Sequence, residues 1–115
     1  MHALNNHVQL IGNLGRDVDF KSLDNGNARA KVSLATKETY RSREGEPQEN
    51  VNWHHLVGWG KIAERMHDQL GKGKYIMVHG KLKTQTRGTG KHRRVFTEVV
   101  VQKFRVLHSP IPPAT

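Results

Sequence analysis

The stretch Val51-Asn52-Trp53-His54-His55-Leu56-Val57-Gly58-Trp59 decides the fold, because its alternating pattern gives way abruptly to a different period. Its odd-numbered residues share one face of an extended strand and its even-numbered residues share the other. Between Lys61 and Leu70 the apolar residues then recur at helical spacing, and Gly71-Lys72-Gly73 ends that segment. The sequence therefore predicts a strand over residues 51–59 followed directly by a short helix.

Two more strands are expected before this unit. Residues 7–15 alternate apolar and polar side chains and should bend near Gly12, since an isolated glycine in a strand often marks a bulge or a barrel bend. Residues 28–39 alternate with period two, and the preceding turn, Asp24-Asn25-Gly26-Asn27, is a hairpin signal because Asn-Gly tolerates positive φ. The polar residues 41–50, with Gly and Pro among them, are predicted to form a loop.

Two further strands are expected after the helix, over residues 74–86 and 95–106, joined by the basic, glycine-broken loop 87–94. The resulting order is typical of an all-β, five-stranded OB-fold barrel with one short helix between strands 3 and 4. We expect one domain over residues 1–107, followed by an unpacked, Pro-rich tail at 108–115.

Composition limits the possible partners. The 115 residues fit one domain, and the net charge of +9 favours a polyanion, with nucleic acid as the leading class. No run approaches the roughly 20 apolar residues that a membrane span needs. There is no cysteine, which excludes disulfides and cysteine-based zinc sites. The N-terminus does not resemble a secretory signal, so we expect a cytoplasmic, nucleoid-associated protein.

Three aromatic residues, Tyr40, Trp53 and Trp59, are candidates for base stacking, because every base has a π-face. Trp53 and Trp59 share strand parity and lie roughly 20 Å apart along an extended strand. Packing in the core is the alternative for a tryptophan, but their polar and cationic neighbours favour exposure.

Basic residues are interleaved with these aromatics and are expected to neutralise phosphates. The loop 87–94 holds four cations and no acid, and their mutual repulsion favours a bound anion. The candidates for nucleic-acid contact from these patterns are Arg41, Arg43, His55, Arg87, Lys91, Arg93 and Arg94.

Metal sites, cofactors and catalysis have little support. His54 and His55 are adjacent, so on a strand they point to opposite faces and cannot chelate together. No serine lies in a nucleophile elbow, and residues 71–74 lack the phosphate-loop pattern. We expect no metal, no cofactor and no enzymatic activity.

The chain also resembles the bacterial single-stranded DNA-binding proteins over roughly residues 4–107. The segments that carry the resemblance, in order, are Val8–Asp17, Val32–Thr36, Trp53-His54-x-Leu56-Val57-x-Trp59-Gly60-Lys61, Ala63-Glu64, Leu70-x-Lys72-Gly73, Val78-x-Gly80-Lys81-Leu82 and Thr97–Val101.

This resemblance implies an OB fold, assembly as a homotetramer and wrapping of single-stranded DNA around it. It implies base stacking on Tyr40, Trp53 and Trp59. The cationic positions that it implies are Lys61, Lys72, Lys83 and Arg94. It places His54 near the subunit interface, to which we also assign Val8 and Leu10.

Two departures from the family pattern stand out. Arg87 occupies a position where the family often has another stacking tryptophan, although a guanidinium plane can also stack on a base. The chain ends in Pro112-Pro113-Ala114-Thr115, without the acidic tip that recruits replication and repair proteins in many members. A short paralogue and a truncated chain both fit this ending.

The sequence thus predicts sequence-tolerant coating of single-stranded DNA in replication, recombination and repair. A dimeric, primosome-type OB paralogue and an RNA-binding OB module remain alternatives. An assembly scaffold, in which Trp53 and Trp59 would be buried, is a third.

Overall fold

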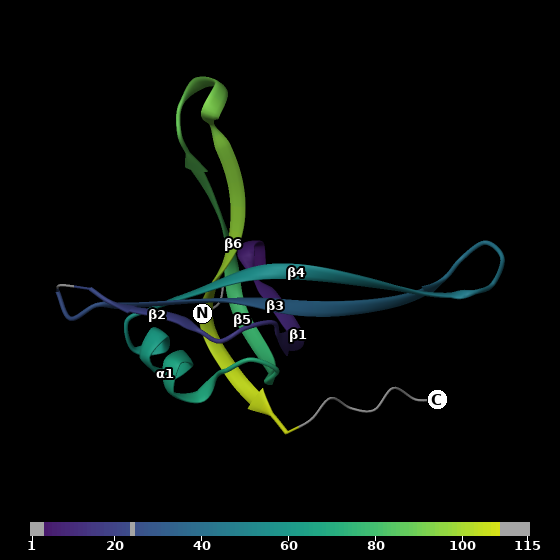
Figure 1. Cartoon of the computed structure of the whole chain (residues 1–115), viewed down its shortest axis with the longest axis horizontal. Helices are drawn as coiled ribbons and strands as arrows, with labels where there is room; N and C mark the ends of the chain where they lie inside the picture. Colours follow the sequence, from purple (N-terminus) through teal and green to yellow (C-terminus); the bar gives the residue numbers. More distant parts are fainter. Residues whose placement is uncertain (1–3, 24, 109–115) are drawn as a thin grey trace.

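The computed structural model describes residues 4–23 and 25–108, and most of them lie in long antiparallel strands (Figure 1). The elements in chain order are the 3-10 helix η1 (Leu4–Asn6), β1 (Val8–Leu14), β2 (Asp19–Ser22), β3 (Ala28–Arg41), β4 (Pro47–Trp59), α1 (Lys61–Gln69), β5 (Tyr75–Arg87), the 3-10 helix η2 (Gly90–His92) and β6 (Arg94–Leu107). The expected Pro-rich tail, from residue 109 on, lies outside the described residues.

The strands close into a barrel of the OB type. The sheet order is β1-β5-β6-β4-β3-β2, and the barrel closes because the end of β1 also pairs with β3. Gly12 stands just before this change of partner, and a Cβ there would collide with the backbone carbonyl of Ala35. The predicted bend of the first strand is therefore a close approach of two backbones.

The core lies inside this barrel. Ala28, Ala30, Val32 and Leu34 of β3 alternate inward and are buried, as their period of two predicts. The helix α1 adds Ala63, Met66 and the following Leu70 to the same core. Gly58 of β4 allows this, because any Cβ at Gly58 would overlap the Met66 sulfur.

The structure adds one strand that the sequence analysis did not predict. The four residues of β2 pair with the start of β3 across the predicted Asn25-Gly26 turn, where Gly26 has a φ of 74°. Three of those four residues are polar and only Phe20 is apolar, so no alternation marked the strand. The helix consequently follows the fourth strand in chain order, although it still follows the third strand of the five-stranded barrel.

The prediction of a loop over residues 41–50 is wrong, because β3 and β4 remain paired as far as Arg41 and Pro47. The connection is only residues 42–46, where the Ser42 amide donates to the Glu46 carbonyl over 2.9 Å. Residues 37–51 form a two-stranded ribbon beyond the barrel, which we call the β3–β4 arm (Figure 1). Residues 84–97 form a second such ribbon, the β5–β6 arm.

Candidate nucleic-acid interface

The outer face of β3 and β4 carries both tryptophans. Trp53 lies opposite Ala35 and Trp59 opposite Arg29, so both indoles share the face that turns away from the core. Their side chains are 58% and 46% exposed. These values argue against the core-packing alternative and leave both rings available as planar surfaces.

A glycine beside Trp53 makes room for its ring. A Cβ at Gly15 would overlap the Trp53 six-membered ring. The Gly15 amide donates to the Ser33 carbonyl over 3.0 Å, which holds the chain after β1 beside β3. The position of the indole therefore depends on the missing side chain at Gly15.

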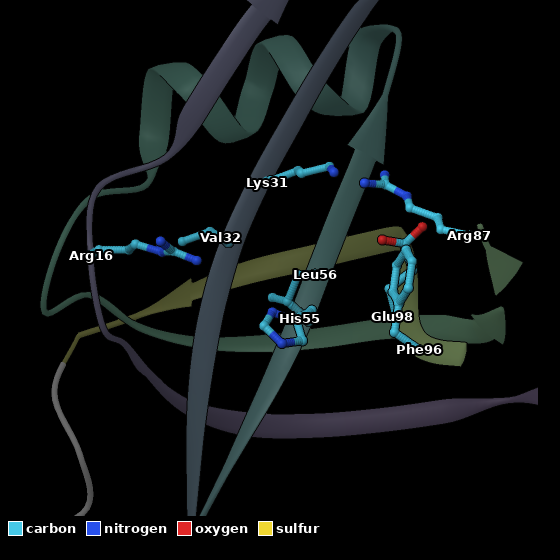
Figure 2. A pocket seen from close by; sticks show the side chains of 8 residues that line it. All are labelled: Arg16, Lys31, Val32, His55, Leu56, Arg87, Phe96 and Glu98. Carbon is cyan, nitrogen blue, oxygen red and sulfur yellow. The ribbon is translucent and has the colours of Figure 1, made fainter. Parts of the chain in front are cut away.

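A pocket of about 250 Å³ opens on the outside of the barrel, and its basic residues come from four segments (Figure 2). Arg16 follows β1, Lys31 lies on β3, His55 on β4 and Arg87 at the end of β5. Figure 2 shows the Lys31 and Arg87 side chains extending toward one another across the pocket. Because Arg16, Lys31 and Arg87 face a shared hollow, the pocket suits an anion or a polarised ring.

Two interactions orient the cationic groups of the pocket. The Arg16 Nη2 donates to the Ser33 Oγ over 3.1 Å. The Arg87 guanidinium carbon lies 5.1 Å from the centre of the Phe96 ring, a distance typical of a cation–π contact. These contacts hold both guanidinium groups at the pocket, and both side chains remain exposed.

The pocket also contains one carboxylate. Glu98 is 6% exposed and accepts a 2.6 Å hydrogen bond from the Gln85 Nε2. A buried carboxylate is costly unless it is hydrogen-bonded or near positive charge, and this one has the Gln85 amide and the cations that line the pocket. Its negative charge opposes the binding of a phosphate at the floor of the pocket.

The β5–β6 arm extends this cationic surface. Its described residues include Arg87, Lys91, Arg93 and Arg94 and no carboxylate. Lys91, Arg93 and Arg94 are exposed around the tip, where Gly88 and Gly90 take positive φ. The structure therefore brings Arg87 into the pocket and leaves the other three cations along the arm.

The β3–β4 arm places its predicted residues differently. Tyr40 is 56% exposed, but its strand parity puts it on the face of the ribbon opposite to Trp53. Arg41 reaches back to the Gly45 carbonyl over 3.4 Å, and Arg43 is exposed in the turn. The three predicted stacking residues are exposed, but only Trp53 and Trp59 share a surface.

The remaining predicted contacts lie at several places around the barrel. Lys61 is exposed at the start of α1, and Lys83 is exposed on the outer side of β5 opposite Glu98. Lys72 lines a separate hollow with Tyr75 and His108, and its backbone amide donates to Asp17. The structure does not bring Lys72 into the pocket with Arg16.

The residues assigned to a subunit interface have partners within this chain. Val8 and Leu10 pack their side chains against the core, whereas Ile11 of the same strand is 42% exposed. His54 is half-buried, and its Nε2 shares a 2.9 Å hydrogen bond with Thr36 Oγ1.

Four residues at this interface were missing from the predicted site. Lys31 and Arg29 were identifiable by strand parity, since they lie opposite Val57 and Trp59 on the outer face. The Nε of Arg29 is buried without a hydrogen-bond partner in the described chain. Arg16 and Glu98 gave no usable signal, because only the closed barrel brings them to the same pocket.

The described residues hold no group of three or more histidines, aspartates or glutamates placed to bind a metal ion. Within residues 4–23 and 25–108, no helix has the length and apolarity that crossing a membrane requires.

Comparison with known proteins places this geometry in a family. A model described as the single-strand binding protein family matches residues 5–107. A solved complex of a Plasmodium falciparum SSB with ssDNA is similar to this chain with a TM-score of 0.80 and 31% identity, over 93% of this chain and 96% of that one. A deletion mutant of the single-stranded DNA binding protein from Thermus aquaticus matches with a TM-score of 0.79 and 26% identity, over 89% of this chain and 50% of that one.

Proposed function

Because this chain belongs to the single-strand binding protein family, we propose that it binds and coats single-stranded DNA with little sequence preference. The observation that carries the proposal is the pair of half-exposed tryptophans on one outer face, beside a pocket lined by Arg16, Lys31 and Arg87. Stacking surfaces next to phosphate-binding cations are the combination that single-strand binding requires.

Each part of this surface has its own role in the proposed mechanism. Bases stack on Trp53 and Trp59, an interaction worth roughly 1–3 kcal/mol per base that any base can make. Arg16, Lys31 and Arg87 neutralise the phosphates between them and release their counterions. Since duplex DNA hides its base faces, the protein binds the unpaired form and shifts the melting equilibrium toward it. Such coating serves replication, recombination and repair, at the nucleoid in the cytoplasm.

The proposal includes assembly of several copies, as a tetramer. From Val8 to Gly12, β1 pairs only with β5, so its other edge has no partner in the described chain. An open strand edge with a half-exposed Ile11 on it is suited to pairing with the same edge of a second copy. We expect Ile11→Glu to lower the mass measured by light scattering, whereas Val51→Glu, at an apolar residue of similar exposure on the β3–β4 arm, serves as the charge control. An unchanged mass for Ile11→Glu would remove β1 from the interface.

Tryptophan fluorescence tests the binding proposal, since the two indoles lie on the proposed surface. Titration with an unstructured thymine strand should quench the emission strongly, and quenching should weaken as salt rises. A duplex of matched length serves as the control and should leave the emission nearly unchanged. Stronger quenching by a uridine strand than by the thymine strand would favour the RNA-binding alternative through contacts to the 2′-OH. If no strand changes the tryptophan emission at low salt, the assembly-scaffold alternative is favoured.

A further inference from the structure

The pocket beside the tryptophans contains a carboxylate that the binding of phosphates does not use. Glu98 is the one acidic side chain among the residues that line this hollow, all of which belong to the described part of the chain (Figure 2). It is buried, and its Oε1 accepts the 2.6 Å hydrogen bond from Gln85. Because a nearby negative charge weakens the binding of a phosphate, this carboxylate serves some other part of a bound strand.

The fold uses only part of the hydrogen-bonding capacity of Glu98. An ionised carboxylate has two oxygens that accept hydrogen bonds and no group that donates one. The bond from Gln85 occupies Oε1, and Oε2 receives no hydrogen bond within residues 4–23 and 25–108. Among the side chains that the structure describes, the Nε of Arg29 is the one buried polar atom without a partner, so Oε2 of Glu98 is still accessible. One acceptor atom therefore remains open to the pocket.

A ligand group that meets this oxygen must donate a hydrogen bond. The phosphates and the deoxyribose rings within a DNA strand have no donor, but the bases do. Cytosine carries an amino group at N4, a group that protein carboxylates accept from, whereas thymine presents the acceptor O4 at the same place. The open oxygen of Glu98 is therefore matched to cytosine and opposed to thymine.

The size and the cations of the pocket complete this match. About 250 Å³ lies below the roughly 300–1,000 Å³ of pockets for small molecules, so the hollow suits one pyrimidine ring better than a run of nucleotides. Beside its amino group cytosine has two acceptors, the ring N3 and the carbonyl O2. Lys31 and Arg87, which extend toward one another across the hollow in Figure 2, are donors without acceptor atoms. One carboxylate among cations thus complements an edge with one amino group and two acceptors.

We propose that this pocket holds one base of the bound strand and that Glu98 selects cytosine over thymine there, an inference that rests on the proposed single-strand binding. The phosphates stay at the rim with the cationic side chains, and Trp53 and Trp59 stack on any base. The surface then has a preference at one nucleotide position and accepts every base at the others.

The test measures affinity for two strands of about 8 nucleotides, one of thymine and one of 5-methylcytosine. Both bases carry the 5-methyl group, so they differ only at the 4-position and at N3. Because the two bases also differ in stacking, the quantity compared between proteins is the ratio of the two affinities.

The main variant is Glu98→Gln, which has nearly the same shape. Its amide oxygen can keep the hydrogen bond from Gln85, and its NH₂ group then lies where Oε2 was. That group donates to thymine O4 and opposes the amino group of cytosine. The ratio of 5-methylcytosine to thymine affinity should therefore fall by about tenfold.

Two further variants separate selection from charge and from folding. Glu49→Gln removes the same charge at an exposed position of the β3–β4 arm, so it should change both affinities by one factor and leave the ratio as in wild type. Glu98→Asp keeps the charge but withdraws the carboxylate by one methylene, and the ratio should fall by less than in Glu98→Gln. Thermal melting followed by circular dichroism shows which variants are folded.

The outcomes separate this inference from the proposed function. If wild type binds neither strand, the proposed function is wrong and this inference falls with it. If wild type binds both strands and folded Glu98→Gln keeps the wild-type ratio, selection by Glu98 is refuted. An equal loss on both strands is one such result, and it would assign Glu98 to the positioning of Gln85. Should Glu98→Gln not fold, an unchanged ratio in Glu98→Asp refutes the selection instead.

Discussion

The β3–β4 arm and the β5–β6 arm are both two-stranded ribbons that extend beyond the barrel, but they differ in charge. The first carries three cations among four carboxylates, at Glu38, Glu44, Glu46 and Glu49. The second carries four cations and no carboxylate. Extension beyond the barrel is therefore not enough to make an arm suited to bind phosphate. We assign phosphate neutralisation to the β5–β6 arm and base stacking to Tyr40 on the other.

The sharpest test of this division removes the charge of the β5–β6 arm. We expect Arg87→Ala/Lys91→Ala/Arg93→Ala/Arg94→Ala to flatten the salt dependence of single-strand affinity by about 2.8 in slope. Over 50 to 200 mM salt, this corresponds to about 50-fold less loss of affinity than in wild type. Titrations at several salt concentrations measure it. Arg41→Ala/Arg43→Ala on the other arm is the comparison, and a larger effect from that pair would reverse the assignment.

Trp53→Ala should have the next largest effect. Loss of one stacked base costs roughly 1–3 kcal/mol, or about 5- to 150-fold in affinity, with the salt slope nearly unchanged. Binding of a labelled strand, followed by anisotropy, gives both quantities. A steep change in salt slope would mean that Trp53 acts by positioning cations instead of stacking.

Tyr40→Ala should matter only for long strands, because Tyr40 lies on the opposite face of its ribbon from Trp53. With a strand of about 8 nucleotides the affinity should match wild type, and with about 30 nucleotides it should fall by about fivefold or more. Tyr40→Phe keeps the ring and is the control. An equal loss on both strands would place Tyr40 and Trp53 on one continuous surface.

A smaller effect is expected from Gly15→Ala, which puts a methyl group where the Trp53 ring lies. Trp53 is exposed and its ring can rotate away, so the melting temperature should hardly change while affinity falls a few-fold. The fluorescence of the free protein should also shift, because the indole moves. Gly15→Ala in a Trp53→Ala background should add nothing further, and an additive loss would show that Gly15 acts separately.

The barrel could be predicted from the sequence because one face of each barrel strand is buried. The inward residues from Ala28 to Leu34 alternate with outward ones, so apolar side chains recur at every second position of the sequence. The β3–β4 arm could not be predicted in the same way. Gln48 and Glu49 are exposed on both faces of a ribbon in solvent, so no hydrophobic alternation marks their strand.

The same reasoning explains which site residues were found. Trp53, Trp59 and Arg87 stand out by residue type and by their neighbours. The pocket itself depends on closure of the barrel, which brings Arg16 after β1 to the same hollow as Arg87 at the end of β5. Glu98 is followed by three valines in β6, and only the fold shows that its carboxylate lies in the pocket beside Gln85.

The most direct test of the account is photo-crosslinking of a single strand that carries 4-thiothymidine, with the attached peptides identified by mass spectrometry. The account predicts crosslinks at Trp53 and Trp59, which disappear when unlabelled single strand competes and persist when duplex competes. Crosslinks that avoid both tryptophans and map only to the β3–β4 turn around Arg43 would contradict it.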